Sequence, residues 1–323
     1  MQDKNKPREF KYEMTLAGNA PWLGNRLNVK TDFLKPWVEI FDSHMNRTAN
    51  LAVMPAMIAT YVRRDQAFYT NAAIRGGHSG IFTMDDLLKH EATREMSADM
   101  EKQVFSFDLV PDALDTYMRG PFGIGFINWH LQKNEGMQSA IDALFASTVM
   151  EAWTAFESLA SDVWVTVVDQ GPKSLANKIA LSKDFRKDEP ITVKALRELE
   201  YDARKELGKF LRETLRVQFS TLEAIKASYS IAFGEDGFKL FDATNNAYIE
   251  ALSAFRNVFA HKLGRADKKF VARVQRFPEY RHIKADDLIE LDGEIVSKLR
   301  DASVQMGFAL VKFVDDYILA NPV

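Results

Sequence analysis

Cysteine is absent from this chain of 323 residues, and its absence excludes several kinds of chemistry at once. Without cysteine there is no disulfide, no thiolate nucleophile and no cysteine-based zinc site. The absence fits a reducing compartment, so we expect a cytoplasmic protein. Long apolar runs are also lacking, because residues 49–62 are interrupted by Pro55 and fall short of the ~20 residues that a membrane-spanning helix needs. Residues 1–8 are charged and no apolar core follows them, so we expect no signal peptide and no membrane partner.

Several familiar catalytic and nucleotide-binding motifs are missing as well. His90 and Glu91 begin like a zinc-protease helix, but Arg94 stands where the second histidine is needed. The glycines near residue 123 do not complete a dinucleotide-binding fingerprint, and no phosphate-binding loop is present. The histidines other than His261 show no metal-ligand spacing. We therefore expect no cofactor and no metal.

The spacing of apolar residues changes near residue 134. Residues 1–134 mix short candidate elements, among them helical spacing around Leu34 to Phe41, a helix at 47–64 and an alternating strand at 103–110. From 135 to 323, apolar residues recur every three or four positions, which is typical of amphipathic helices. We therefore predict a mainly α protein, with an N-terminal region of unknown fold (1–134) and an all-α domain of about five helices (135–323).

The longest predicted helix, residues 137–169, stops before Gly171 and carries an unusually broad apolar arc. Trp153 and Trp164 widen this arc, which indicates either burial at the centre of the domain or contact with a partner subunit. A stripe of mostly small polar residues lies opposite; Glu151 in it is expected to be solvated and is given no role. The other predicted helices cover residues 192–201, 202–216, 221–233, 243–263 and 292–319.

The main chemical candidate is the segment Arg256-Asn257-Val258-Phe259-Ala260-His261 near the end of a predicted helix. A permanently charged guanidinium and an imidazole that titrates near neutrality can act together on a phosphate group. Asn257 and His261 are four residues apart and share a helix face. Spacing alone does not identify a site, because Arg276 and His282 show a similar separation and because polar residues in a last turn also satisfy helix carbonyls.

The context of this segment resembles the HEPN superfamily (higher eukaryotes and prokaryotes nucleotide-binding). The signature of that family is an arginine, four to six residues and a histidine, often with a polar residue directly after the arginine, as in Arg256 to His261. A long opening helix and a closing amphipathic helix are similar to the family's bundle, and the resemblance covers residues 135–323. It implies a metal-independent endoribonuclease that acts as a homodimer with a composite site. Many relatives are toxins or phage-defence effectors, so an antitoxin or inhibitor protein is a candidate partner.

The resemblance implies roles for three residues: His261 as general base or acid, Arg256 as stabiliser of phosphate charge and Asn257 as an orienting hydrogen bonder. The net charge of −3 predicts no overall attraction to RNA, so a local patch must provide it. From residue 256 to 284 there are nine Lys or Arg against two acids, and we assign RNA contacts to Lys262, Arg265, Lys268 and Lys269. Three aromatic side chains lie in the same stretch and either stack on bases or pin the loop to the core: Phe270, Phe277 and Tyr280.

Two alternatives stay open at this stage. The first is a catalytically silent all-α module that binds a nucleotide, RNA or protein partner, with Arg256 and His261 as structural residues. The second places the activity in residues 1–130 and leaves the helical part as a dimeriser. The direction in which Arg256 and His261 point in the fold bears on the first of these.

Overall fold

The computed structural model describes residues 27–52, 54, 135–180, 197, 207–214, 217–241 and 243–321. This part of the chain is mainly α-helical, and apart from an isolated bridge between Arg265 and Leu288 it holds no β-structure. The predicted mainly α fold is thereby confirmed for the described residues. Among them, no helix is both long enough and apolar enough to cross a membrane.

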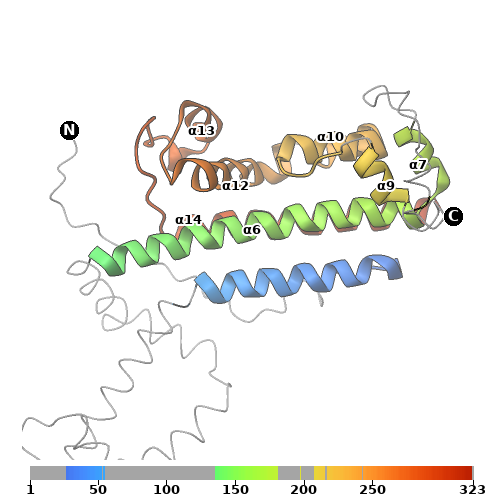
Figure 1. The fold of residues 1–323 in the computed structure, drawn as a ribbon, viewed down its shortest axis with the longest axis horizontal. Coiled ribbons are helices and arrows are strands. Elements are labelled where there is room, and N and C mark those ends of the chain that lie inside the picture. The colour runs from blue at the N-terminus through green and yellow to red at the C-terminus, as the bar shows by residue number, and fades with distance from the viewer. Residues whose placement is uncertain are drawn as a thin grey trace, which may run out of the picture. The chain divides into compact units, whose positions relative to one another are not determined.

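Two long helices, α6 (Glu135–Gln170) and α14 (Gly293–Ala320), lie along each other at the centre (Figure 1). The hydroxyl of Ser303 donates to the carbonyl of Ala152 at 2.8 Å, and Gly307 lies beside Leu159. Because the residue numbers rise together along both helices, α6 and α14 run parallel. Asp292 caps α14 by accepting a hydrogen bond from the backbone of Ile295 at 2.7 Å, which is the usual role of an acidic N-cap.

A helix at residues 35–52, preceded by the 3-10 turn η1 (Asp32–Leu34), packs against the same pair of long helices. Phe41 lies beside Gly307, and the backbone N–H groups of Lys30 and Thr31 donate to the carboxylate of Asp315 at 3.0 and 2.8 Å. Low residue numbers thus meet high ones, so this helix runs antiparallel to α14. Burial raises the pKa of Asp315, but the hydrogen bonds from Thr31 and Lys30 outweigh burial and leave that pKa below its ordinary value.

This helix differs from the sequence prediction in two respects. We expected a break between the Leu34 to Phe41 segment and a helix at 47–64, whereas one helix runs through residues 35–52. The sequence from 37 to 52 contains no glycine or proline, and Pro36 sits in the first turn, where proline is tolerated. The chain divides into two units, one of which joins residues 20–51 to 143–323, while the predicted division had placed residues 1–134 apart.

The remaining helices largely match the periodicity of the sequence. α6, α10, α12 and α14 agree with predicted helices, and α9 lies inside the predicted 202–216. The predicted helix 192–201 is described only at Arg197, which is helical, and the predicted strand 103–110 lies outside the described residues. Three short helices, α7, α11 and α13, were not predicted. The bounds are α7 (Lys173–Ala180), α9 (Leu207–Thr214), α10 (Leu222–Phe233), α11 (Glu235–Lys239), α12 (Ala243–Lys262), α13 (Lys268–Val274) and the 3-10 turn η2 (Pro278–Tyr280).

The core between α6 and α10 is aromatic and is closed by two hydrogen bonds. The indole of Trp164 donates to the carbonyl of Ser228 at 3.1 Å, and the hydroxyl of Tyr229 donates to the carbonyl of Ala160 at 2.8 Å. Both Trp153 and Trp164 have no exposed surface. Of the two interpretations of these tryptophans, burial at the centre of the domain is confirmed and contact with a partner subunit is not, because the broad apolar arc of α6 is buried by the chain's own helices.

Candidate functional site

The predicted catalytic segment forms the last turns of α12. Phe255 on its buried side packs edge-to-face on Phe270 and Tyr280 at 5.0 Å between ring centroids, which fixes the end of the helix. The helix ends because Leu263 and Gly264 both take left-handed backbone conformations, with φ of 50° and 78°. Glycine adopts such a φ without cost, whereas leucine does not, so the backbone is strained at Leu263.

Arg256 points towards α6 and is held there. Its Nη2 lies 3.9 Å from Oε2 of Glu157, and its Nη1 donates to Oδ1 of Asn257 at 3.1 Å. The same Oε2 accepts a hydrogen bond from the indole of Trp153 at 2.8 Å. The side chain of Arg256 is 24% exposed, so solvent still reaches the guanidinium. The structure therefore brings Arg256 and Asn257 together and adds Glu157, which the sequence had not suggested.

His261 is exposed in the last turn of α12 and has no hydrogen-bond or ion-pair partner among the described residues. It follows Arg256 by five positions, which on an α-helix corresponds to about 140° around the axis and about 7.5 Å along it. Arg256 faces α6, whereas His261 faces solvent. Within one chain, the two predicted catalytic side chains are therefore not directed at a common point.

The predicted RNA-binding residues lie on the surface beyond α12: Lys262, Arg265, Lys268 and Lys269 are all exposed. Their segment is held in place, because Ile289 N–H donates to the carbonyl of Gly264 at 2.8 Å and the backbones of Ala266 and Asp286 are joined at 2.7 Å. Arg265 donates to the carbonyl of Asp286 at 3.3 Å. This pairing also places the exposed carboxylates of Asp286 and Asp287 beside the basic segment, which lowers its net positive charge below the value counted from the sequence.

The aromatic residues of this stretch do not reach solvent. Phe270, Phe277 and Tyr280 are buried, and Phe277 packs on Tyr248 at 5.0 Å between centroids. Of the two roles considered from the sequence, pinning the loop to the core is confirmed, and stacking on bases is excluded for buried rings. Burial raises the pKa of Tyr280 well above its ordinary value.

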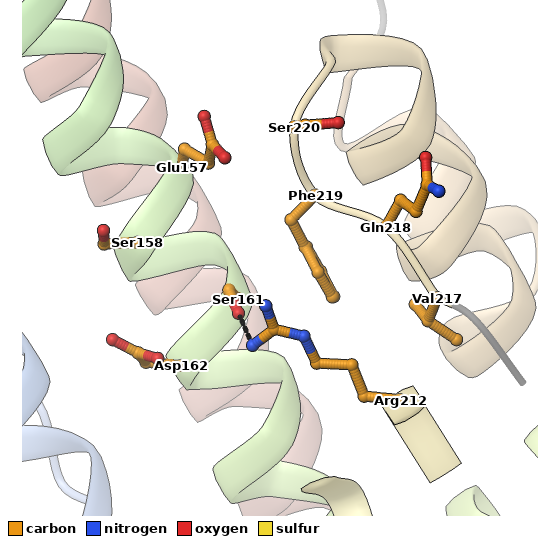
Figure 2. A pocket seen from close by; sticks show the side chains of 9 residues that line it. All are labelled: Glu157, Ser158, Ser161, Asp162, Arg212, Val217, Gln218, Phe219 and Ser220. Carbon is orange, nitrogen blue, oxygen red and sulfur yellow. Dashed lines mark hydrogen bonds between the residues drawn. The ribbon is translucent and has the colours of Figure 1, made fainter. Parts of the chain in front are cut away.

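A pocket of about 370 Å³ lies next to Arg256, between α6 and the segment that joins α9 to α10 (Figure 2). One wall belongs to α6 and the other to residues 217–220, with Arg212 of α9 at one end. Figure 2 shows Glu157 and Ser161 turned towards residues 217–220, whereas Ser158 and Asp162 are turned towards the other flank of α6. The lining residues are Glu157, Ser158, Ser161, Asp162, Arg212, Val217, Gln218, Phe219 and Ser220.

Arg212 contacts both walls of this pocket. Its Nη1 donates to the hydroxyl of Ser161 at 2.6 Å, and its guanidinium lies 5.5 Å from the ring centroid of Phe219, within the range of a cation–π contact. Phe219 in turn packs edge-to-face on the buried Trp164 at 5.8 Å. Burial raises the pKa of the Asp162 carboxyl, and the nearby charge of Arg212 partly offsets that rise.

Sequence reasoning had singled out part of one wall only. The polar stripe on α6 was visible from its spacing, and Ser158 and Asp162 belong to it. The opposite wall carried no recognisable motif, and Arg212 meets Ser161 across a separation of 51 residues. The expectation that Glu151 lies at the solvated surface is consistent with its exposed ion pair with Arg47 at 2.5 Å. Within the described ranges, no group of three or more His, Asp or Glu side chains is placed to hold a metal ion.

Comparisons with known protein families, with curated protein sequences and with solved structures found no match.

Proposed function

We propose that this protein is a metal-independent endoribonuclease whose reaction centre uses Arg256, Asn257 and His261. The observation that carries the proposal is the exposed imidazole of His261, four residues after Asn257 and followed at once by exposed Lys262 and Arg265 on a hydrogen-bonded segment. An imidazole is the side chain suited to proton transfer at neutral pH, and fixed cations beside it suit a phosphate backbone.

The proposed reaction is attack of a ribose 2′-hydroxyl on the adjacent phosphorus. One imidazole of His261 removes the hydroxyl proton as the new P–O bond forms, and the bond to the 5′ oxygen then breaks. A protonated imidazole returns a proton to that leaving oxygen. The products are a 2′,3′-cyclic phosphate and a 5′-hydroxyl, so the step needs no metal ion. Arg256 stabilises the charge of the phosphorane, and DNA is inert because it lacks the 2′-hydroxyl.

The proposal includes a second copy of the chain. Arg256 and His261 point to different sides of α12, so one chain does not present both groups to one phosphate. A homodimer that places the two α12 ends together would supply one histidine as base and the other as acid. A role as a toxin or antiviral-defence effector, held in check by an inhibitor protein, belongs to the same proposal.

The test is cleavage of total RNA in EDTA by wild type, His261→Ala and Arg256→Ala, with analysis of the product ends. Because general acid–base catalysis contributes about 10²- to 10⁴-fold, His261→Ala should lower the cleavage rate at least about 100-fold. Wild type should leave cyclic phosphate ends. His282→Ala is the matched control, since His282 is also exposed and follows an arginine at similar spacing.

Equal loss in His282→Ala, or unchanged cleavage by both His261→Ala and Arg256→Ala, would contradict the proposal. Arg256→Lys is a second variant for the arginine, because it keeps a positive charge near Glu157 while removing the planar fork. Thermal melts of all variants separate loss of chemistry from loss of fold.

A catalytically silent binding module is the second candidate, and a specific contact favours it. Arg256 is engaged by Glu157 and Asn257, as expected of an arginine that holds α12 on α6. In that case the wild type leaves RNA intact over hours, and binding of RNA, nucleotide or a protein partner is its function. The same incubation therefore distinguishes the two candidates.

A further inference from the structure

The pocket beside Arg256 has an acceptor at one end and donors at the other. Glu157 provides the acceptor end. Its Oε2 accepts a hydrogen bond from the indole of Trp153 and faces Arg256, whereas its Oε1 has no partner among the described residues. The donor end is Arg212, which uses Nη1 on Ser161 and has further N–H groups without an acceptor in this part of the structure. Gln218 and Ser220, both exposed, line the wall between these ends.

The lining limits the chemistry of a ligand. The volume of about 370 Å³ is within the range of small-molecule pockets, about 300–1,000 Å³. A ligand that fills it needs N–H donors for Glu157 and a carbonyl or ring-nitrogen acceptor for Arg212. A simple polyamine satisfies only the carboxylate end, and an inorganic anion satisfies only the guanidinium end.

Guanine is the nucleobase whose edges match both ends. Its N1–H and N2–H₂ groups lie side by side and can donate to one carboxylate, while its O6 and N7 form a pair of acceptors that arginine recognises in a bidentate manner. Adenine and cytosine each have one exocyclic amino group with no ring N–H beside it, and uracil has only one N–H donor, so none of the three presents two neighbouring donor groups to one carboxylate. A carboxylate and an arginine at opposite ends of one pocket therefore favour guanine over the other three bases.

We propose that this pocket binds a guanine base, with Glu157 on its Watson–Crick edge and Arg212 on its O6 and N7 acceptors. The inference deepens the proposed function, on which it rests for RNA as the source of the base. Sequence-specific RNA recognition uses bases splayed out of single strands, which an open pocket can receive. Because Glu157 also contacts Arg256, a base held here lies beside one of the three residues of the proposed reaction centre.

The test is titration of the full chain with nucleosides by calorimetry, supported by tryptophan fluorescence. Nucleosides carry no phosphate, so the basic residues after α12 do not contribute. Guanosine should bind at least about fivefold tighter than adenosine, cytidine or uridine, the lower end of what a bidentate base contact discriminates. Inosine, which lacks only the N2 amino group, should bind more weakly than guanosine. Trp153 and Trp164 lie close enough to report binding.

Glu157→Gln is the decisive variant, because the amide replaces the carboxylate with a group of the same shape. It should lose the preference for guanosine over inosine and adenosine. The matched control is Glu223→Gln on α10, whose carboxylate is exposed and pairs with Arg273 away from the pocket at 2.7 Å. Arg212→Lys, which keeps the positive charge but removes the planar guanidinium with its paired N–H donors, should weaken guanosine binding as well. Equal affinity for the four nucleosides, no saturable guanosine binding, or an unchanged preference in a folded Glu157→Gln would overturn the proposal.

A second measurement separates guanine in RNA from a free guanine nucleotide. If RNA is the source, the cleavage sites of wild type cluster next to guanines and guanosine inhibits cleavage. If guanosine binds with the expected preference but the chain does not cleave RNA, the pocket assignment stands and the proposed ribonuclease function fails. If His261→Ala abolishes cleavage but no nucleoside binds, the function stands and the pocket assignment fails.

Discussion

Replacing Gly307 with alanine should destabilise the protein, although the same change in an open helix stabilises it. Gly307 lies in the middle of α14. A methyl group there would meet two ring atoms of Phe41, Cε1 at 2.5 Å and Cζ at 2.6 Å, and Cδ2 of Leu159 at 3.1 Å. The variant therefore tests directly whether the helix at 35–52 docks on α14 in the way described.

The magnitude follows from two opposing contributions. Alanine in a helix interior is favoured over glycine by about 1 kcal/mol. Carbon atoms pack at about 3.5–4.0 Å, so the Phe41 ring has to retreat by about 1 Å. That ring is 2% exposed and is enclosed by the core, which places the cost in the upper half of the usual 1–3 kcal/mol for overpacking. We expect a net loss of about 1–2 kcal/mol in the free energy of unfolding.

Urea and thermal unfolding, followed by far-UV circular dichroism, would measure this loss. At about 2–4 °C per kcal/mol for a domain of 150–250 residues, the melting temperature should fall by about 2–8 °C. The exposed Gln305→Ala on the same helix is the control and should change stability by less than about 0.5 kcal/mol. Adding Phe41→Leu to Gly307→Ala should recover part of the loss, because the smaller side chain relieves the contact. A gain of about 1 kcal/mol in Gly307→Ala would refute the docking.

Two further predictions concern the site. Burial raises the pKa of Asp162 in the folded state, so the ionised carboxylate destabilises the fold. This destabilisation is zero below the ordinary pKa near 3.8 and increases as the pH rises to the folded pKa. Asp162→Asn should therefore raise the urea midpoint at pH 7 and leave it unchanged near pH 3, and an equal effect at both pH values would contradict the burial of the charge. Leu263→Gly should raise stability by about 0.5–1 kcal/mol, because glycine relieves the backbone strain at φ 50°. Leu263→Ala, which keeps that strain, should show no such gain in a thermal melt.

Local rules were sufficient for much of the fold. Thr221 and Gly234 bracket α10 in the structure as their cap positions predict, and the side chain of Thr221 accepts from the backbone of Ala224 at 3.1 Å. α6 ends just before Gly171, and α12 ends just before Leu263. These boundaries depend on neighbours in sequence, so periodicity and capping residues identify them.

Tertiary context accounts for what the sequence did not reveal. A broad apolar arc looks the same whether a partner or the chain itself covers it, which is why the sequence leaves both interpretations of Trp153 and Trp164 open. α13 is only seven residues long and contains lysines and arginines, so the apolar periodicity after its cap, Asp267, is too short to indicate a helix. The pocket joins α6 to Arg212 and to residues 217–220, and no local pattern records which loop will face which helix.

The same holds for the candidate reaction centre. The sequence brought Arg256, Asn257 and His261 together as one motif, and the helix spreads them over different sides. Glu157 could not be foreseen as the partner of Arg256, because it lies 99 positions earlier on another helix. The separation of the two catalytic candidates is a property of helical geometry that a linear motif conceals.

The pairing of the helix at 35–52 with α14 has a consequence for how the chain is made. α14 is synthesised after every other described helix. Roughly 240 further residues are added between the end of the helix at 35–52 and the start of α14, which takes about 10–50 s at ordinary translation rates. During that interval Phe41 and Met45, both 2% exposed in the finished fold, have no cover from α14. The amide groups that will bind Asp315 are also still hydrated. A chain that lacks α14 therefore exposes the apolar face of the helix at 35–52, which is the kind of surface that chaperones and proteases recognise.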